Sequence, residues 1–234
     1  MNPKIRSCLA ARIEAVEARI AAACRRAGRP RGAVTLVAVT KTVPAEVAGL
    51  LAELGVLDLG ENRPQELWKK AAAVAQVRWH LIGHLQRNKI APTLPLVHMI
   101  HSVDSLRLLE ALEQETVKPI DVLLEVNASR EASKQGFAAE EVPALAEKIR
   151  ELRHVRVQGL MAMAALEDDP ERCRPTFQLA RELSDRLRNE LGLDFPLPHL
   201  SMGMTNDFEV AIEEGATLVR VGSALFAGLD GVVS

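Results

Sequence analysis

A lysine directly follows a short apolar segment near the start of the chain. Residues 36–40 are Leu-Val-Ala-Val-Thr, a run without alternation that is typical of a strand buried on both faces. Lys41 comes next, and in parallel α/β folds the chemistry gathers at the carboxyl ends of strands. Lys41 is therefore a candidate nucleophilic amine. The alternative, a solvated lysine at a strand end, is still open at this point.

Two segments that contain glycine and serine follow the last two expected strands. Residues 201–207 are Ser-Met-Gly-Met-Thr-Asn-Asp, and residues 222–226 are Gly-Ser-Ala-Leu-Phe. Glycine lets backbone amides approach a ligand closely, serine adds a hydroxyl donor, and a helix N-terminus favours an anion. Ser201, Gly222 and Ser223 are therefore candidate phosphate ligands, in the two loops where barrels often bind phosphate. The alternative is that they are ordinary turn and cap residues.

An amine and a phosphate site at one barrel mouth would suit a particular ligand. The last strand of a closed barrel lies beside the first, so Lys41 and Gly222 would be neighbours. Pyridoxal 5′-phosphate (PLP) carries both a phosphate and an aldehyde that reacts with a lysine amine. Arg220, two residues before Gly222, could donate to the pyridine nitrogen, which an always-protonated guanidinium would keep neutral. An ion pair at the barrel rim is the alternative for Arg220.

Eight short apolar segments alternate with helical patterns along the chain. The expected strands are 36–40, 56–59, 77–82, 97–101, 121–126, 155–160, 199–200 and 217–221. The expected helices are an N-terminal amphipathic one at 3–27 and others at 45–54, 64–74, 105–114, 140–152, 170–191 and 206–214. This pattern predicts an α/β fold, a single closed (β/α)8 TIM-type barrel, as one domain over residues 1–234. An open doubly wound sheet is the alternative architecture.

Composition and missing motifs argue against several functions. The net charge is −2 and no segment approaches the length of a membrane span, so we expect neither nucleic acid nor a membrane as a partner. The three cysteines form no CxxC pair and no leader peptide is visible, so we expect a cytoplasmic protein. Phosphate-loop, dinucleotide-binding, zinc-protease and hydrolase motifs are absent. We expect a monomer rather than a stable oligomer, and a flexible lid at residues 128–138.

Four histidines occur as two closely spaced pairs. His80 and His84 are four residues apart, and His98 and His101 are three apart. A metal site needs further ligands at matching spacing, and the sequence offers none. We therefore expect no metal, and we interpret His84, which follows a strand, as a residue that lines the barrel mouth.

Several ordered motifs resemble those of one known family. They are Val37-Ala38-Val39-Thr40-Lys41, Gly60-Glu61-Asn62 with Gln65-Glu66, His80-Leu81-Ile82-Gly83 with Leu85-Gln86 and Asn88-Lys89, Ser201-Met202-Gly203-Met204, and Val219-Arg220-Val221-Gly222. They are similar to motifs of the pyridoxal-phosphate homeostasis protein family (YggS/PROSC type), and the resemblance covers nearly the whole chain. The chain departs from the family pattern at Arg63-Pro64, Thr205 and Ser223, and it lacks a basic C-terminal tail.

The resemblance implies a fold, a cofactor and a set of contacts. The fold is a barrel like the N-terminal domain of alanine racemase, which is fold type III among PLP proteins, and the cofactor is PLP. Lys41 matches the family's Schiff-base lysine, and Arg220 matches the residue that faces the pyridine nitrogen. The remaining implied cofactor contacts are Asn62, His84, Met163, Ser201, Gly222 and Ser223.

Three functions are compatible with these residues. The resemblance implies a PLP-binding protein of vitamin B6 and amino-acid homeostasis without evident turnover, whose partners beyond PLP would be PLP-dependent apo-enzymes. The alternative is an amino-acid racemase-like enzyme. Alanine racemase uses a tyrosine as its second base and carries a further β-domain, whereas this chain contains no tyrosine and ends soon after its last strand, so we expect no catalytic residues. The third function is a barrel for another phosphorylated metabolite, with Lys41 as an electrostatic contact only.

Overall fold

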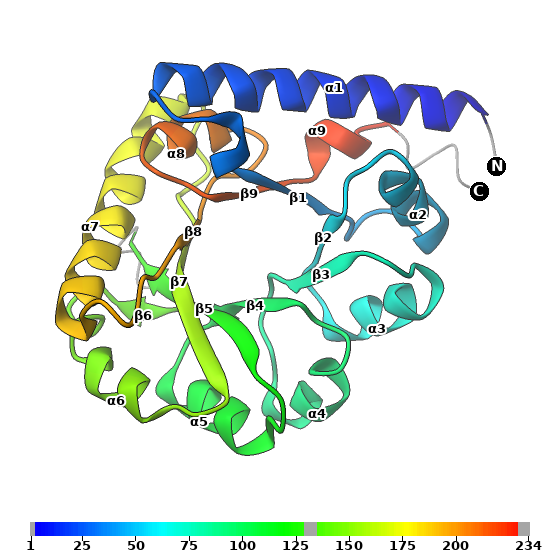
Figure 1. Ribbon diagram of the computed structural model, residues 1–234. Helices are drawn as coiled ribbons and strands as arrows, with labels where there is room; N and C mark the ends of the chain where they lie inside the picture. Colours follow the sequence, from blue (N-terminus) through cyan, green and yellow to red (C-terminus); the bar gives the residue numbers. More distant parts are fainter. Residues whose placement is uncertain (1–2, 129–134, 229–234) are drawn as a thin grey trace.

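Eight parallel strands close into a barrel that is surrounded by helices (Figure 1). The computed structural model describes residues 3–128 and 135–228. The barrel strands follow the order β1-β2-β3-β4-β5-β7-β8-β9, and β9 pairs with β1 to close the ring. This confirms the predicted (β/α)8 barrel and excludes an open sheet. Of the lid predicted at 128–138, residues 129–134 lie outside the described ranges, and Phe137–Ala138 form a short strand, β6, beside β5.

The elements have the following bounds. The barrel strands are β1 (Thr35–Val39), β2 (Asp58–Glu61), β3 (Arg78–Leu81), β4 (Met99–Val103), β5 (Ile120–Asn127), β7 (Val155–Ala162), β8 (His199–Ser201) and β9 (Leu218–Val221). The helices are α1 (Pro3–Arg26), α2 (Ala45–Glu53), α3 (Pro64–Ala73), α4 (Ile90–Thr93), α5 (Leu106–Glu115), α6 (Leu145–Glu151), α7 (Arg174–Leu191), α8 (Phe208–Glu213) and α9 (Ser223–Phe226).

Two strands lie two residues further along the chain than the sequence predicted. β2 and β4 begin at Asp58 and Met99, whereas the predicted strands begin at 56 and 97. The prediction placed the strands by their apolar residues. In the structure, Val56 is buried but lies outside β2, whereas the polar Asp58 belongs to it. Pairing between strands decides the register, which sets Leu59 of β2 beside β1.

Three helices begin at least two residues later than predicted. α6 begins at Leu145 rather than at 140, since residues 139–144 form turns. α8 begins at Phe208 rather than at 206. The helix predicted from 170 is a 3₁₀ turn, Pro170–Cys173, followed by α7. Pro175 lies in the first turn of α7, where a missing backbone N–H costs no helical hydrogen bond.

The barrel wall separates two apolar regions. The larger region fills the space between the strands and the surrounding helices. The smaller one lies inside the barrel and consists of Val37, Met99, Leu123, Met161 and Leu218. Because side chains alternate along a strand, the inward positions beyond this apolar layer decide what faces the barrel mouth.

The N-terminal helix α1 lies across one side of the barrel, over α8 and α9 (Figure 1). Its apolar face is buried, and Leu9 is fully enclosed. Arg19 bonds to Glu209 of α8 at 2.8 Å, and Arg12 donates to the Leu225 carbonyl of α9 at 3.1 Å. The predicted amphipathic helix is confirmed, and it holds the two short helices that follow β8 and β9.

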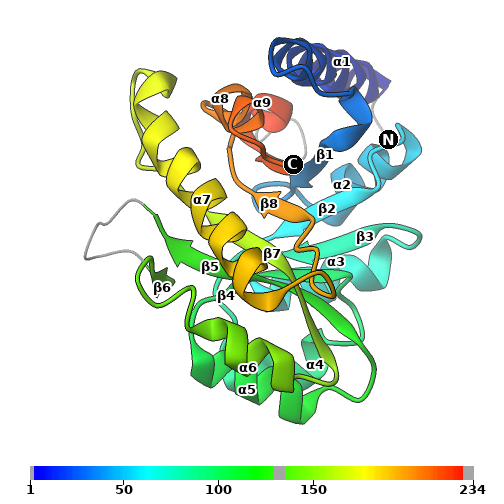
Figure 2. The same ribbon diagram turned by 60° about the vertical axis from the view of Figure 1, so that its left-hand side comes forward.

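The long helix α7 packs along the outside of β7 and β8 (Figure 2). Its first residue, Arg174, bonds to the carboxylates of Glu171, Glu213 and Glu214, each at 2.7 Å. Two of these acids lie at the end of α8, so the ion pairs fix the helix that follows the β8 loop. None of the helices in the described ranges combines the length and the apolar character needed to cross a bilayer.

Candidate ligand-binding site at the barrel mouth

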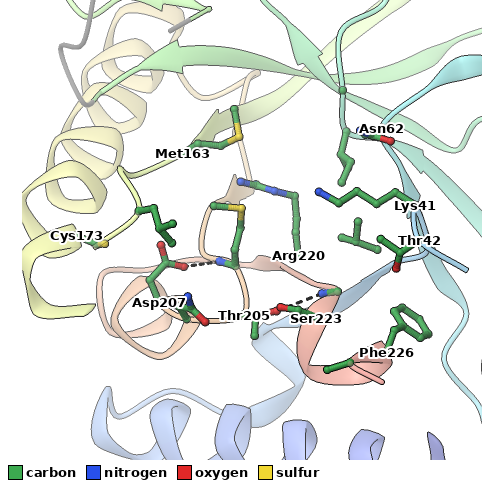
Figure 3. Close-up of a pocket in the computed structure, with 18 of the residues that line it drawn as sticks. Lys41, Thr42, Asn62, Met163, Cys173, Thr205, Asp207, Arg220, Ser223 and Phe226 are labelled. Atoms are coloured by element: carbon green, nitrogen blue, oxygen red, sulfur yellow. Dashed lines mark hydrogen bonds between the residues drawn. The ribbon is translucent and has the colours of Figure 1, made fainter. Parts of the chain in front are cut away.

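A cavity of about 540 Å³ opens at the carboxyl ends of the strands (Figure 3). Its wall is built from the segments that follow β1, β2, β3, β7, β8 and β9. These are the segments that carry the chemistry in (β/α)8 barrels. The predicted site residues in the wall are Lys41, Asn62, Met163, Arg220, Gly222 and Ser223.

Lys41 reaches this cavity from the end of β1. Val37 lies in the inner core and Val39 in the cavity wall, and Lys41 continues the same alternation. Its side chain is exposed and extends toward Arg220 (Figure 3). Within the described ranges, nothing accepts a hydrogen bond from the Lys41 ammonium. The amine is therefore available to a ligand.

A buried ion pair holds the strand end that carries Lys41. The Lys70 ammonium of α3 donates to the Thr40 carbonyl at 2.6 Å and to the Glu61 carboxylate. The Thr40 hydroxyl donates to the same carboxylate at 2.6 Å. Glu61 is fully buried, and its Oε2 has no hydrogen-bond partner in the described structure. The peptide that precedes Lys41 is thus held from the side facing the helices, an arrangement that the sequence did not reveal.

The loops after β8 and β9 meet at the cavity floor. The Thr205 hydroxyl accepts hydrogen bonds from the backbone N–H groups of Gly222 and Ala224, each at 3.4 Å. Asp207 accepts from the Met204 N–H at 2.5 Å. Burial raises the pKa of Asp207, although this hydrogen bond works in the opposite direction. The two loops predicted to bind phosphate therefore form one connected surface.

Glycine at two positions permits close packing of these loops against neighbouring elements. A Cβ added at Gly222 would lie 3.3 Å from the carbonyl oxygen of Val39 on the neighbouring strand. Gly203 has a φ of +89°, and a Cβ there would lie 2.6 Å from the Ala211 Cβ. Ser223 begins α9 and lines the cavity. Glycine thus lets the β9 loop approach the end of β1 at Gly222, and lets the β8 loop pack closely against α8 at Gly203.

Arg220 is the second cation of the cavity, and it is buried. Its Nη1 donates to the carbonyl and the hydroxyl of Ser201 at 2.7 and 2.6 Å, and its Nη2 donates to the Ala162 carbonyl at 3.0 Å. Burial lowers the pKa of Arg220 to about 10, against the opposing influence of Asp207 and Glu125. The group stays protonated at neutral pH, and its acceptors are neutral oxygens rather than the rim carboxylate considered above.

Two predicted contacts lie away from the cavity wall. Ser201 is the last residue of β8 and points into the barrel, where its hydroxyl lies between Arg220 and His101. The prediction had treated Ser201 as part of the loop beyond the strand. His84 is about half exposed, bonds to Asp104 at 2.9 Å and lines a neighbouring hollow that shares Asn62 with the cavity.

Several wall residues were not predicted. Thr205 and Phe226 belong to the two segments that the sequence singled out, and Thr42 directly follows Lys41, so their positions in the sequence are a signal that identifies them. Cys173 reaches the wall from a 3₁₀ turn, and no sequence signal marks it as a wall residue. Within the described ranges, no three His, Cys, Asp or Glu side chains gather as metal ligands.

One carboxyl inside the barrel has an altered acidity. Glu125 on β5 is buried, and burial together with the negative charge of Asp104 raises its pKa to about 7. Arg220 and His84 oppose this rise. Glu125 is therefore only partly ionised at neutral pH, at a position close enough to influence the Arg220 charge.

Comparison with known proteins identifies relatives over nearly the full length. The family model described as alanine racemase, N-terminal domain, matches residues 12–230. A pyridoxal phosphate homeostasis protein from Aquifex aeolicus is 44% identical over 220 residues, which cover 92% of this chain and 96% of that one. A protein of the same name from Pseudomonas aeruginosa is 42% identical over 229 residues and covers 96% and 97% of the two chains.

Solved structures agree with this assignment. PipY from Synechococcus elongatus, whose structure was solved with PLP bound, superposes with a TM-score of 0.81 at 30% identity and covers 94% of this chain and all of its own. Alanine racemase from Corynebacterium glutamicum superposes with a TM-score of 0.69 over 92% of this chain and 62% of its own. At 17% identity, the latter shows a shared fold only. This chain belongs to the family of the alanine racemase N-terminal domain and, within it, to the pyridoxal phosphate homeostasis proteins.

Proposed function

We propose that this protein binds PLP in the barrel-mouth cavity, holds it covalently on Lys41, and acts in PLP homeostasis as a carrier without catalytic turnover. The observation that carries this proposal is that one cavity contains a lysine amine with no acceptor among the described residues and, directly after the adjoining strand, the loop of Gly222 and Ser223. The family relationship and the PLP-bound PipY relative support the same ligand.

The donor groups of the cavity suit each part of PLP. When bound, PLP supplies an aldehyde, which condenses with a primary amine to a Schiff base with loss of water, together with a phosphate and a pyridine ring. Lys41 provides the amine. Ser223 and Thr205 offer donors for the phosphate oxygens, since they line the cavity where the two loops meet.

The ring would lie between these two attachment points. Arg220 lines the cavity as a protonated donor and suits a pyridine nitrogen that accepts a hydrogen bond. Met163 and Asn62 line the wall and would contact the ring and its substituents. His84 and Ser201 lie away from that wall, so we assign them no direct contact with the cofactor.

We prefer the carrier role to a racemase because the chain contains no tyrosine, the residue that serves as the second base in alanine racemase. Two-base racemisation needs an acid or base on each face of the substrate carbon, and the tyrosine that serves in alanine racemase has no counterpart here, since the chain contains none. A partner that accepts PLP would be a PLP-dependent apo-enzyme. Transfer is measured by adding the loaded protein to such an apo-enzyme and following the activity that it regains.

The first experiment is the visible absorption spectrum with added PLP, before and after borohydride, followed by peptide mass mapping. We expect an absorption band that borohydride removes and a pyridoxyl group on Lys41. A protein that stays colourless with PLP would overturn the proposal, and a band whose adduct maps to another lysine would overturn the role of Lys41. Racemisation of L- or D-amino acids by the loaded protein would favour the enzyme instead.

A further inference from the structure

Five buried polar side chains form one continuous file across the barrel interior. They come from β2, β3, β4, β8 and β9, and each is 7% exposed or less. His80 Nε2 lies 2.9 Å from Asp58 Oδ1, and His80 Nδ1 lies 2.9 Å from His101 Nε2. His101 Nδ1 lies 2.9 Å from Ser201 Oγ, to which Arg220 donates. We call this file, Asp58-His80-His101-Ser201-Arg220, the interior chain.

The Arg220 end fixes the role of the Ser201 oxygen. A guanidinium has N–H donors and no acceptor, so the Ser201 oxygen must accept from it. The hydroxyl hydrogen of Ser201 is then available to His101 Nδ1, although the second lone pair of the oxygen would also allow His101 to donate. Burial lowers the pKa of His101 well below the ordinary histidine value, so this imidazole is neutral. With Ser201 as the donor, His101 carries its proton on Nε2 and donates to His80.

The Asp58 end is consistent with the same direction. Burial alone would raise the pKa of Asp58, but hydrogen bonds from His80 and Arg78 lower it to about 2. An ionised carboxylate only accepts, so His80 carries a proton on Nε2. If its Nδ1 is unprotonated, this atom accepts from His101. One arrangement then serves every link: Ser201 donates to His101, His101 to His80 and His80 to Asp58. The reverse arrangement would need a proton on both nitrogens of His80.

The orientation of Arg220 depends on this chain. A guanidinium carries five N–H groups, and three of those on Arg220 have acceptors in the described structure: two at Ser201 and one at Ala162. The two that remain belong to Nε and Nη2, on a side chain that lines the cavity. Ser201 therefore fixes which edge of Arg220 faces the barrel and which donors are left for a ligand.

We propose that Ser201, His101, His80 and Asp58 are positioning residues that orient Arg220 toward the ligand through this directional chain, with both histidines as neutral Nε2–H tautomers. The proposal rests on the proposed function for the identity of the ligand. It also gives the Ser201 hydroxyl a fixed partner inside the barrel, in place of the phosphate contact that the sequence predicted.

The direction of the chain is measured first in the protein without ligand. Two-bond ¹H–¹⁵N correlation spectra distinguish the Nε2–H, Nδ1–H and doubly protonated imidazoles, and His80→Gln and His101→Gln variants assign the signals. We expect both residues to be neutral and to carry the proton on Nε2. An Nδ1–H tautomer or a charged ring at either position would overturn the proposal. Because no PLP is present, this result does not depend on the proposed function.

The effect on the site is measured by PLP titration of Ser201→Ala. This variant removes only the Ser201 hydroxyl group, which is one acceptor of Arg220 and the donor to His101. We expect PLP to bind about tenfold more weakly, as befits one hydrogen bond to a charged group, and the His101 tautomer to become mixed. Unchanged affinity together with an unchanged tautomer would overturn the positioning role.

A second variant and a matched control separate positioning from packing. Asp58→Asn keeps the shape of the far end, but its amide no longer requires a donor on His80, so we expect mixed tautomers and weaker PLP binding. His98→Gln is the control: the His98 ring packs edge-on against His80 at 5.5 Å but is more exposed and lies outside the chain. We expect PLP affinity and both tautomers to stay as in the wild type, and a loss equal to that of Asp58→Asn would overturn the proposal.

The outcomes keep the two proposals apart. If the wild type does not bind PLP, the proposed function fails, and the tautomers alone still decide whether the chain is directional. If the wild type binds PLP on Lys41 and Ser201→Ala binds it equally well, the proposed function stands and the positioning role fails.

Discussion

Lys41 and Arg220 reach the same cavity from neighbouring strands, but their surroundings differ. The Lys41 side chain is exposed and has no acceptor in the described structure, whereas Arg220 is 4% exposed and donates to three oxygens. A nucleophilic amine has to reach its carbonyl and change partners during condensation. A hydrogen-bond donor for a ring atom has to stay in place, and buried acceptors keep it there.

The fold nevertheless controls both positions, by different means. At Lys41 it restrains the backbone, through the ion pair of Glu61 and Lys70 behind the strand end. At Arg220 it restrains the head group itself, through Ser201 and the interior chain. The end of β1 thus presents an exposed side chain, Lys41, on a backbone that is held in place. Strand β9 presents a side chain, Arg220, whose head group is itself held in place. Four variants test this comparison, from the largest expected effect to the smallest.

Lys41→Ala removes the exposed amine and is expected to have the largest effect on PLP binding. The borohydride-trapped adduct should disappear completely, and PLP should bind more than about tenfold more weakly, because only the phosphate and ring contacts remain. Mass mapping after borohydride and an absorption titration measure the two quantities. Lys89→Ala is the control, since Lys89 lines the neighbouring hollow, and it should keep the adduct. A wild-type yield of adduct in Lys41→Ala would refute the assignment.

Glu61→Gln tests the rigid peptide behind Lys41. The variant leaves the buried Lys70 ammonium without its counter-charge, so we expect the free energy of unfolding to fall by about 3–5 kcal/mol. Urea unfolding measures this change. Glu66→Gln is the control, because Glu66 lies on α3, the helix that carries Lys70, and its ion pair with Lys69 is exposed. Loss of that pair should cost less than about 1 kcal/mol. Equal effects of the two variants would mean that the buried pair holds nothing in place.

Glu125→Gln tests the charged groups that surround Arg220 inside the barrel. The carboxyl pKa is raised from 4.5 to about 7, so below pH 4.5 Glu125 is protonated in both the folded and the unfolded states. As the pH rises from 4.5 through 7, the unfolded chain releases its proton first, and the folded state loses stability. Relative to the variant, the wild type should lose roughly 3 kcal/mol of unfolding free energy between pH 4 and pH 8. Parallel stability curves would contradict the raised pKa.

Arg220→Ala removes the buried guanidinium. We expect PLP to bind about ten- to a hundredfold more weakly, while the adduct on Lys41 still forms at saturating PLP. The reason is that the aldehyde and the phosphate keep their own partners. Titration gives the affinity, and borohydride trapping gives the adduct. Thermal unfolding of the variant shows whether the barrel remains intact. If the affinity does not change, Arg220 serves the fold and not the ligand.

Much of the architecture was predictable because it is local in sequence. The apolar run before Lys41, the alternation of strands with helices, and the amphipathic pattern of α1 depend on neighbouring residues, and all are found in the structure. Strand bounds were less predictable. β2 and β4 are buried on both faces, so their register follows from pairing and not from apolar content.

The candidate site divides in the same way. Lys41, Gly222 and Ser223 follow strand ends, so the topology of a barrel alone brings them to one mouth. The direction of Ser201 could not be predicted, because it depends on whether that residue is the last of β8 or the first of the loop. The two pairs of histidines gave no hint of a contact between the pairs, yet His80 and His101 meet each other inside the barrel.

Sequence alone thus determined the order of strands and helices, the lysine at the end of the first strand and the loops at the same mouth, because each follows from residues that are adjacent in the chain. Only the tertiary structure decided which polar groups face one another inside the barrel. His101 and Ser201 are 100 residues apart, and Glu61 and Lys70 belong to a strand and the helix that covers it. Such contacts arise when the barrel closes and buries polar groups, which must then find partners across strands whose register only pairing fixes.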